Sequence, residues 1–176
     1  KIYAQCKQEF LQVLAVKLAG GVSGSEPVAF LSEVLDAGSP RVQAAALEAL
    51  ARKKVDPGAM GRAAALHINS PLLKLKVSAL LVLSRVDPAA GLHALTELLE
   101  SEDDVQRVEG AYALGYLRAA EATSVLGDLA IADPRSPVRM QAIKSLAKHD
   151  PAQAIPLLAK VANSSNARVA ALAARA

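Results

Sequence analysis

Residues 136–161 read SPVRMQAIKSLAKHDPAQAIPLLAKV and contain two helix patterns joined by a short turn. Asp150 offers an N-cap for the second pattern, and Pro151 follows at the first helical position, where its missing N–H costs nothing. The apolar residues that share one helical face of this pattern are Ile155, Leu158 and Val161. The stretch therefore predicts a helix, a turn and a second helix.

The same arrangement recurs along the whole chain. When the second-helix patterns are aligned, one leucine comes into register at spacings of 33, 31 and 32 residues. The aligned leucines are Leu50, Leu83, Leu114 and Leu146. Asp-Pro turns recur as well, at residues 55–57, 86–88 and 149–151. A period of this length is typical of stacked helix pairs, and we expect the four leucines to be buried at equivalent contacts.

A helix pair of this size cannot bury its apolar face alone and must stack on its neighbours. The sequence therefore predicts an all-α fold, a right-handed α-solenoid of about five helix pairs that form one repeat domain over residues 1–176. The predicted parts are a leading helix at 1–19, a loop at 20–27 and repeats at about 27–57, 58–87, 88–120, 121–150 and 151–176. Because the last pattern stops within a helix, we expect the chain to be part of a longer protein.

Residues 136–161 resemble the HEAT-like repeats of the phycobilisome-lyase type. The resemblance rests on the Val-Arg start of one helix, its alanine and leucine steps, and Pro156 inside the other helix. It extends over nearly the whole chain from about residue 27 and implies an armadillo-like solenoid. It also implies a structural row that bonds acidic groups and carbonyls in the turns, made of Gln43, Lys76, Arg107 and Arg139.

The sequence offers little for catalysis or metal binding. Cys6 is the only cysteine, which excludes an internal disulfide and a Cys-based zinc site, and the three histidines are scattered. The glycine-rich residues 19–24 lack the Lys-Ser/Thr ending of a phosphate loop. The acidic residues 100–109 lack the alternating oxygen ligands and the glycine of a calcium loop. We therefore expect no enzyme activity, no cofactor and no bound metal.

Charge and hydropathy limit the kinds of partner. The net charge of +3 is mild for a nucleic-acid binder. No stretch of about 18 uninterrupted apolar residues occurs, so we expect no direct membrane insertion. A single cysteine fits a reducing compartment and favours a cytoplasmic location.

Rows of equivalent residues run across the repeated second helices. Three of these rows turn away from the aligned leucines and are expected to line the concave face. Two of the three tyrosines of the chain fall in these rows, one helical turn apart and flanked by cations. Exposed Tyr and Arg often dominate the energy of an interface. The predicted partner-binding residues are Arg52, Arg85, Glu109, Tyr112, Tyr116, Gln141, Lys144 and Lys148.

These features predict a non-enzymatic scaffold that binds a protein segment with acidic residues. In this hypothesis the Arg and Lys side chains pair with the acidic residues, and the tyrosines clamp apolar or backbone groups. One alternative is that the two rings only pack over neighbouring helices. A second is a nucleic-acid binder with a basic groove, against which Glu48 and Glu109 argue. A third, a tetrapyrrole-lyase-like subunit, is implied only by the resemblance, and the oligomeric state stays open.

Overall fold

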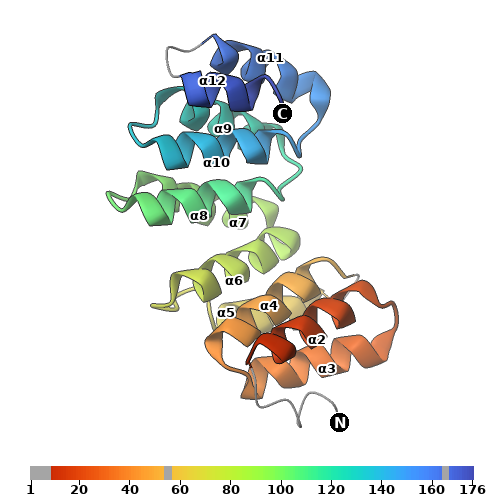
Figure 1. The fold of residues 1–176 in the computed structure, drawn as a ribbon. Coiled ribbons are helices and arrows are strands. Elements are labelled where there is room, and N and C mark those ends of the chain that lie inside the picture. Colours follow the sequence, from red (N-terminus) through yellow and green to blue (C-terminus); the bar gives the residue numbers. More distant parts are fainter. Residues whose placement is uncertain (1–8, 54–56, 164–166) are drawn as a thin grey trace. The chain divides into compact units, whose positions relative to one another are not determined.

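The computed structural model describes residues 9–53, 57–163 and 167–176, and all regular structure in these ranges is helical (Figure 1). The helices are α2 (Glu9–Gly21), α3 (Ser25–Ala37), α4 (Pro40–Ala51), α5 (Pro57–Ala65), α6 (Leu73–Val86), α7 (Pro88–Glu97), the short 3-10 helix η1 (Leu98–Glu100), α8 (Asp104–Leu114), α9 (Ala120–Ala132), α10 (Ser136–Leu146), α11 (Pro151–Ala162) and α12 (Ala167–Ala173). The all-α fold class is therefore confirmed.

The chain divides into two compact units. Unit 1 is Lys1–Gly91, unit 2 is Leu92–Ala176, and the boundary falls within α7. The single repeat domain expected over residues 1–176 stays a prediction.

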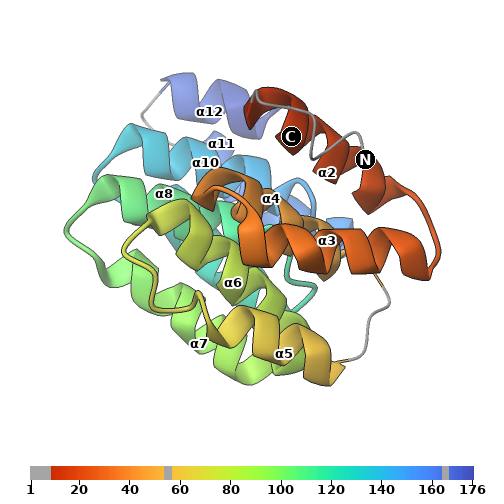
Figure 2. The same cartoon turned by 90° about the horizontal axis from the view of Figure 1, so that it is seen from below.

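In unit 1, α2, α4 and α6 pack side by side, with α3 against α2 and α4, and α5 against α4 and α6 (Figure 2). The leading helix therefore lies in the row of second helices and is not isolated. Its connection to α3 is shorter than the predicted 20–27 loop, because α2 continues to Gly21 and α3 begins at Ser25. The core of this unit includes the fully buried Leu31, Val42 and Leu47.

In unit 2, α8, α10 and α12 form one layer, and α7, α9 and α11 form the other (Figure 1). Each helix pair packs against the next pair along the chain, with Leu114, Leu126, Ile143 and Leu146 fully buried between them. Stacking between neighbours is the arrangement of an α-solenoid, which confirms the predicted architecture.

The Asp residues of the predicted turns cap the following helices. An Asp150 side-chain oxygen accepts a hydrogen bond from the backbone N–H of Ala152 at 3.0 Å. Asp87 accepts one from the N–H of Ala90, also at 3.0 Å. These bonds satisfy donors that the first turn of a helix leaves without an intrahelical partner. The third turn, at 55–57, falls partly on residues outside the described ranges.

The aligned leucines are buried in three of the four repeats. Leu50, Leu114 and Leu146 are at most 4% exposed, whereas Leu83 is only partly buried and its neighbour Val82 is fully buried. The prediction for Leu83 is therefore wrong. In α6 nearly every position from 77 to 83 is apolar, so the sequence defines no narrow stripe and packing decides which face of the helix turns inward.

We expect Leu114→Ala to lower the free energy of unfolding by about 3 kcal/mol, because the truncation leaves a cavity among fully buried neighbours. Leu83→Ala serves as the matched control and should cost less than half as much, since solvent already reaches that side chain. Urea unfolding followed by circular dichroism measures both changes. Equal losses in the two variants would contradict the different burial of the two leucines.

Candidate functional site

The predicted site residues of unit 2 come from two adjacent helices, α8 and α10. An Asp103 carboxylate oxygen caps α8 by accepting from the N–H of Val105 at 2.9 Å. At the other end of α8, a Cβ placed on Gly115 would lie 2.8 Å from the Cβ of Ser145 in α10. A glycine is therefore needed for the end of α8 to approach α10 this closely. Because Tyr116 follows Gly115 directly, this close approach places Tyr116 near the C-terminal end of α10.

The two tyrosines form a pair with defined geometry. The ring centroids of Tyr112 and Tyr116 are 5.1 Å apart and the ring planes meet at 65°, an edge-to-face arrangement. The Tyr116 hydroxyl donates a hydrogen bond to the Tyr112 hydroxyl at 3.0 Å. Tyr116 is 47% exposed, and Tyr112 is partly buried. The rings thus hold each other in place while one of them faces solvent.

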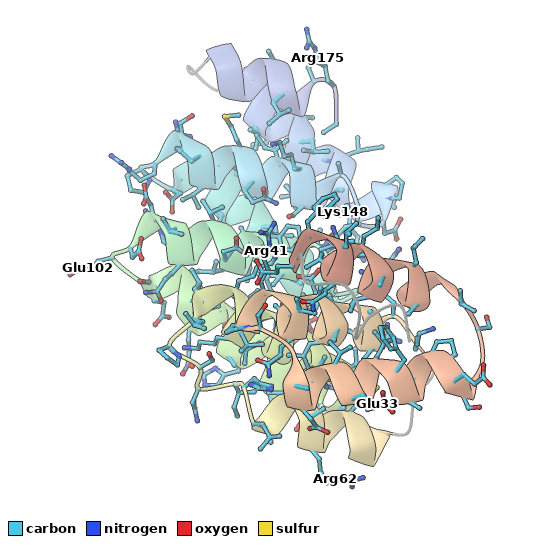
Figure 3. The ribbon with its side chains drawn as sticks, turned by 60° about the horizontal axis from the view of Figure 1, so that its bottom comes forward. Glu33, Arg41, Arg62, Glu102, Lys148 and Arg175 are labelled. Carbon is cyan, nitrogen blue, oxygen red and sulfur yellow. The ribbon has the colours of Figure 1, made fainter. Side chains whose placement is uncertain are left out.

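Lys148 lies over both rings. This residue, labelled in Figure 3, comes just after the end of α10. Its Nζ is 4.2 Å from the centroid of the Tyr116 ring and 5.1 Å from that of Tyr112. A cation over an aromatic face at an exposed site is stabilised by about 0.5–1 kcal/mol. The ammonium group is therefore oriented by the rings and is still exposed.

The remaining predicted residues of unit 2 lie on the same two helices. Gln141 and Glu109 are partly buried, and the Gln141 amide donates to the Ser145 hydroxyl at 3.3 Å. Lys144 is exposed in the last turn of α10. We call the group the tyrosine–lysine face, which consists of Glu109, Tyr112, Tyr116, Gln141, Lys144 and Lys148.

Arg52 and Arg85 belong to unit 1. Arg52 is the C-cap residue of α4, Arg85 is in the last turn of α6, and both side chains are exposed. Ser78 and Leu81 of α6, which align with Glu109 and Tyr112 in the rows predicted to face outward, are buried. They fall in the apolar run of α6, where the rotation of the helix was not predicted.

His149 anchors the segment that carries Lys148. Its Nε2 donates to the carbonyl of Leu114 at 3.1 Å, so in the neutral ring Nδ1 accepts from the Thr123 hydroxyl at 2.7 Å. Burial lowers the pKa of His149, and the positive charges of Arg118 and Lys148 lower it further, against the opposite effect of the Leu114 carbonyl. The neutral imidazole therefore connects the turn after α10 to the end of α8 by a hydrogen bond.

Sequence reasoning missed this role of His149. The aligned residues in the other repeats are Lys53, Val86 and Leu117. A histidine that occurs in only one repeat of a variable row carries no periodic signal, and its partners are 26 and 35 residues away.

Three of the four residues in the row predicted to be structural bond backbone carbonyls, two of them in turns. Gln43 donates to a carbonyl near the end of α3 at 2.7 Å, and Arg139 donates to the carbonyl of Asp133 at 2.6 Å. Arg107 donates to the carbonyls of Ser101 and Glu102 at 2.8 and 3.1 Å, while the Glu102 side chain projects outward (Figure 3). The expected role in the turns is therefore confirmed for Arg107 and Arg139, whereas Gln43 bonds a carbonyl within α3.

In the described ranges, no three His, Cys, Asp or Glu side chains come together as a metal site would require. Among the same residues, no helix combines the length and apolar content needed to cross a bilayer.

The stacked helix pairs define an all-helical repeat protein of the α-solenoid class. Residues 92–176, which make up unit 2, match the family model described as HEAT repeats. The match supports a HEAT-like repeat protein, and repeats of this kind generally mediate protein interactions and are typically non-enzymatic.

A crystal structure of an engineered protein from the Northeast Structural Genomics Consortium is similar at 20% sequence identity with a TM-score of 0.47. The similarity covers 82% of this chain and 75% of that chain. No curated protein matches the sequence.

Proposed function

We propose that the protein is a non-enzymatic scaffold whose tyrosine–lysine face binds an acidic segment of a partner protein. The observation that supports this most directly is the position of Lys148 over both tyrosine rings on a partly exposed surface. The rings hold the ammonium group in place, so binding an anion immobilises less of the side chain than binding by a free lysine would.

The charges around the face favour an anionic partner. Lys144, Lys148 and Arg118 are all exposed on or beside the C-terminal turns of α8 and α10. Glu109 is the acidic member of the face and is partly buried, one helical turn before Tyr112. An acidic chain would therefore meet three cations at one end of the face and an aromatic surface beside them.

Arg52 and Arg85, the exposed cations that were predicted in unit 1, are proposed to bind acidic residues there. A cytoplasmic location is part of the same proposal. The finer resemblance to the phycobilisome-lyase type also stays a prediction, and colour that co-purifies with the protein would support it.

The test is fluorescence anisotropy with a labelled peptide made of Glu, Asp and Leu. We expect saturable binding that weakens roughly thirtyfold in the Tyr112→Ala/Tyr116→Ala double variant, the scale of an interface hot spot of about 2 kcal/mol. Lys148→Gln should also weaken binding. Lys160→Gln is the matched control, since it removes one exposed lysine from α11 in the other layer of unit 2.

Two outcomes would contradict the proposal. Equal weakening by Lys148→Gln and Lys160→Gln would indicate general charge attraction without a site. A double tyrosine variant that melts much earlier yet binds the peptide unchanged would show that the rings only hold the repeats together. A labelled DNA of similar length tests the nucleic-acid alternative, which predicts tighter binding with a steep salt dependence.

A further inference from the structure

A groove in unit 2 lies between two helices of the layer opposite the tyrosine–lysine face. Its volume is about 450 Å³. One wall comes from the end of α7 and from η1, and the other comes from α9. The lining residues are Thr96, Leu99, Glu100, Val125, Asp128, Leu129, Ala132 and Asp133.

The α9 wall exists because this helix is apolar on two sides. One side, with Ala122, Leu126 and Ala130, is buried. The second side of α9 lines the groove, with residues that recur at helical spacing. The apolar residues on this side, Val125 and Leu129, are only partly buried. An apolar stripe that its own fold leaves partly uncovered is typical of an interaction surface.

The opposite wall is fixed by close packing against α8. A Cβ placed on Gly110 would lie 2.8 Å from Cδ2 of Leu99 and 3.2 Å from the Cβ of Leu98. The glycine therefore allows Leu99 to settle against α8, where it forms part of the lining. This contact places the Leu99 side chain between α8 and the groove.

Both walls carry a carboxylate. Glu100 and Asp128 are exposed, and neither makes a hydrogen bond or ion pair with another residue in the described part of the chain. The other polar groups of the lining are already engaged. The Thr96 hydroxyl donates to the carbonyl of His93, and Asp133 pairs with Arg107. The charge available to an occupant is therefore negative on both sides of an apolar lining.

We infer that this groove docks a partner segment in which a bulky apolar side chain is flanked by Lys or Arg. The apolar side chain covers Leu99, Val125 and Leu129, and the cations pair with Glu100 and Asp128. Unit 2 thus has two docking surfaces of opposite preference, one for an acidic segment and one for a basic apolar segment.

The experiment uses the full chain and a labelled peptide in which Leu residues alternate with Arg residues between Gly-Ser spacers. We expect saturable binding in fluorescence anisotropy, weakened at least about tenfold in the Glu100→Gln/Asp128→Asn double variant. Glu121→Gln is the matched control, because it removes an exposed carboxylate from α9 outside the lining. Ala132→Trp, which fills the groove from its exposed end, should also weaken binding.

Several results would overturn the inference. No saturable binding, or equal weakening by the control and the double variant, would show that the groove is not a site. If the affinity is unchanged after every Leu of the peptide is replaced by Ser, charge alone accounts for the binding. If the protein self-associates without peptide and the double variant abolishes this, the groove is occupied by a second copy of the chain. The Lys148→Gln variant should bind this peptide normally, so a failure here is distinct from a failure of the tyrosine–lysine face.

Discussion

Replacing Gly91 with alanine is expected to destabilise the protein by about 3 kcal/mol or more, at the upper end of the costs of overpacking. Gly91 lies in the first turn of α7 and is buried against α6. A Cβ at this position would lie 2.3 Å from the Cα of Ser84 and 2.6 Å from its backbone nitrogen. Both are backbone atoms, so the helices must move apart to admit one methyl group.

The matched control is Gly61→Ala in the middle of α5. There the nearest atom to an added Cβ is Cγ1 of Val86, at an ordinary contact distance of 3.7 Å. An alanine inside a helix is favoured over glycine by about 0.5–1 kcal/mol, so this variant should be slightly more stable than the wild type. Urea unfolding followed by circular dichroism compares the two. A Gly91→Ala variant as stable as Gly61→Ala would show that α6 and α7 are not packed at this distance.

Replacing Arg107 with alanine is expected to cost about 3–5 kcal/mol, because it leaves a buried carboxylate without its cation. The Arg107 and Asp133 side chains are 10% and 4% exposed, and Arg107 Nε lies 2.9 Å from an oxygen of Asp133. The hydrogen bond to Asp133 raises the pKa of Arg107, against the opposite effect of burial, so the guanidinium keeps its charge. Arg107 also bridges two turn carbonyls, so its loss frees the turn before α8.

Arg139 offers the comparison, since it occupies the same row in the next repeat. Its guanidinium bonds the carbonyls of Asp133 and Pro134 but no buried carboxylate in the described ranges. Arg139→Ala should therefore cost only about 1 kcal/mol, the scale of a net hydrogen bond. Thermal unfolding of both variants measures the difference. Similar losses would mean that the ion pair adds nothing beyond the carbonyl contacts.

The candidate site was only partly predictable from the sequence. Helical periodicity placed Tyr112 and Tyr116 on one face and Lys144 and Lys148 on the equivalent face of the next repeat. It did not predict that Lys148 lies over both rings, because that depends on how closely α8 and α10 approach at Gly115. The groove beside α9 was missed as well. Its two walls share no periodic row, and only their packing brings them together.

The sequence by itself determined the helices, their pairing and their caps. Helix formation and capping depend on residues within a few positions of one another, as in the Asp150 cap. The tertiary structure alone decided the rotation of α6, the place of α2 among the second helices and the tie from His149 to Leu114. These features depend on atoms that meet from distant parts of the chain, as Leu114 and His149 do at a separation of 35 residues. An apolar residue is compatible with several such contacts, and close packing selects one of them.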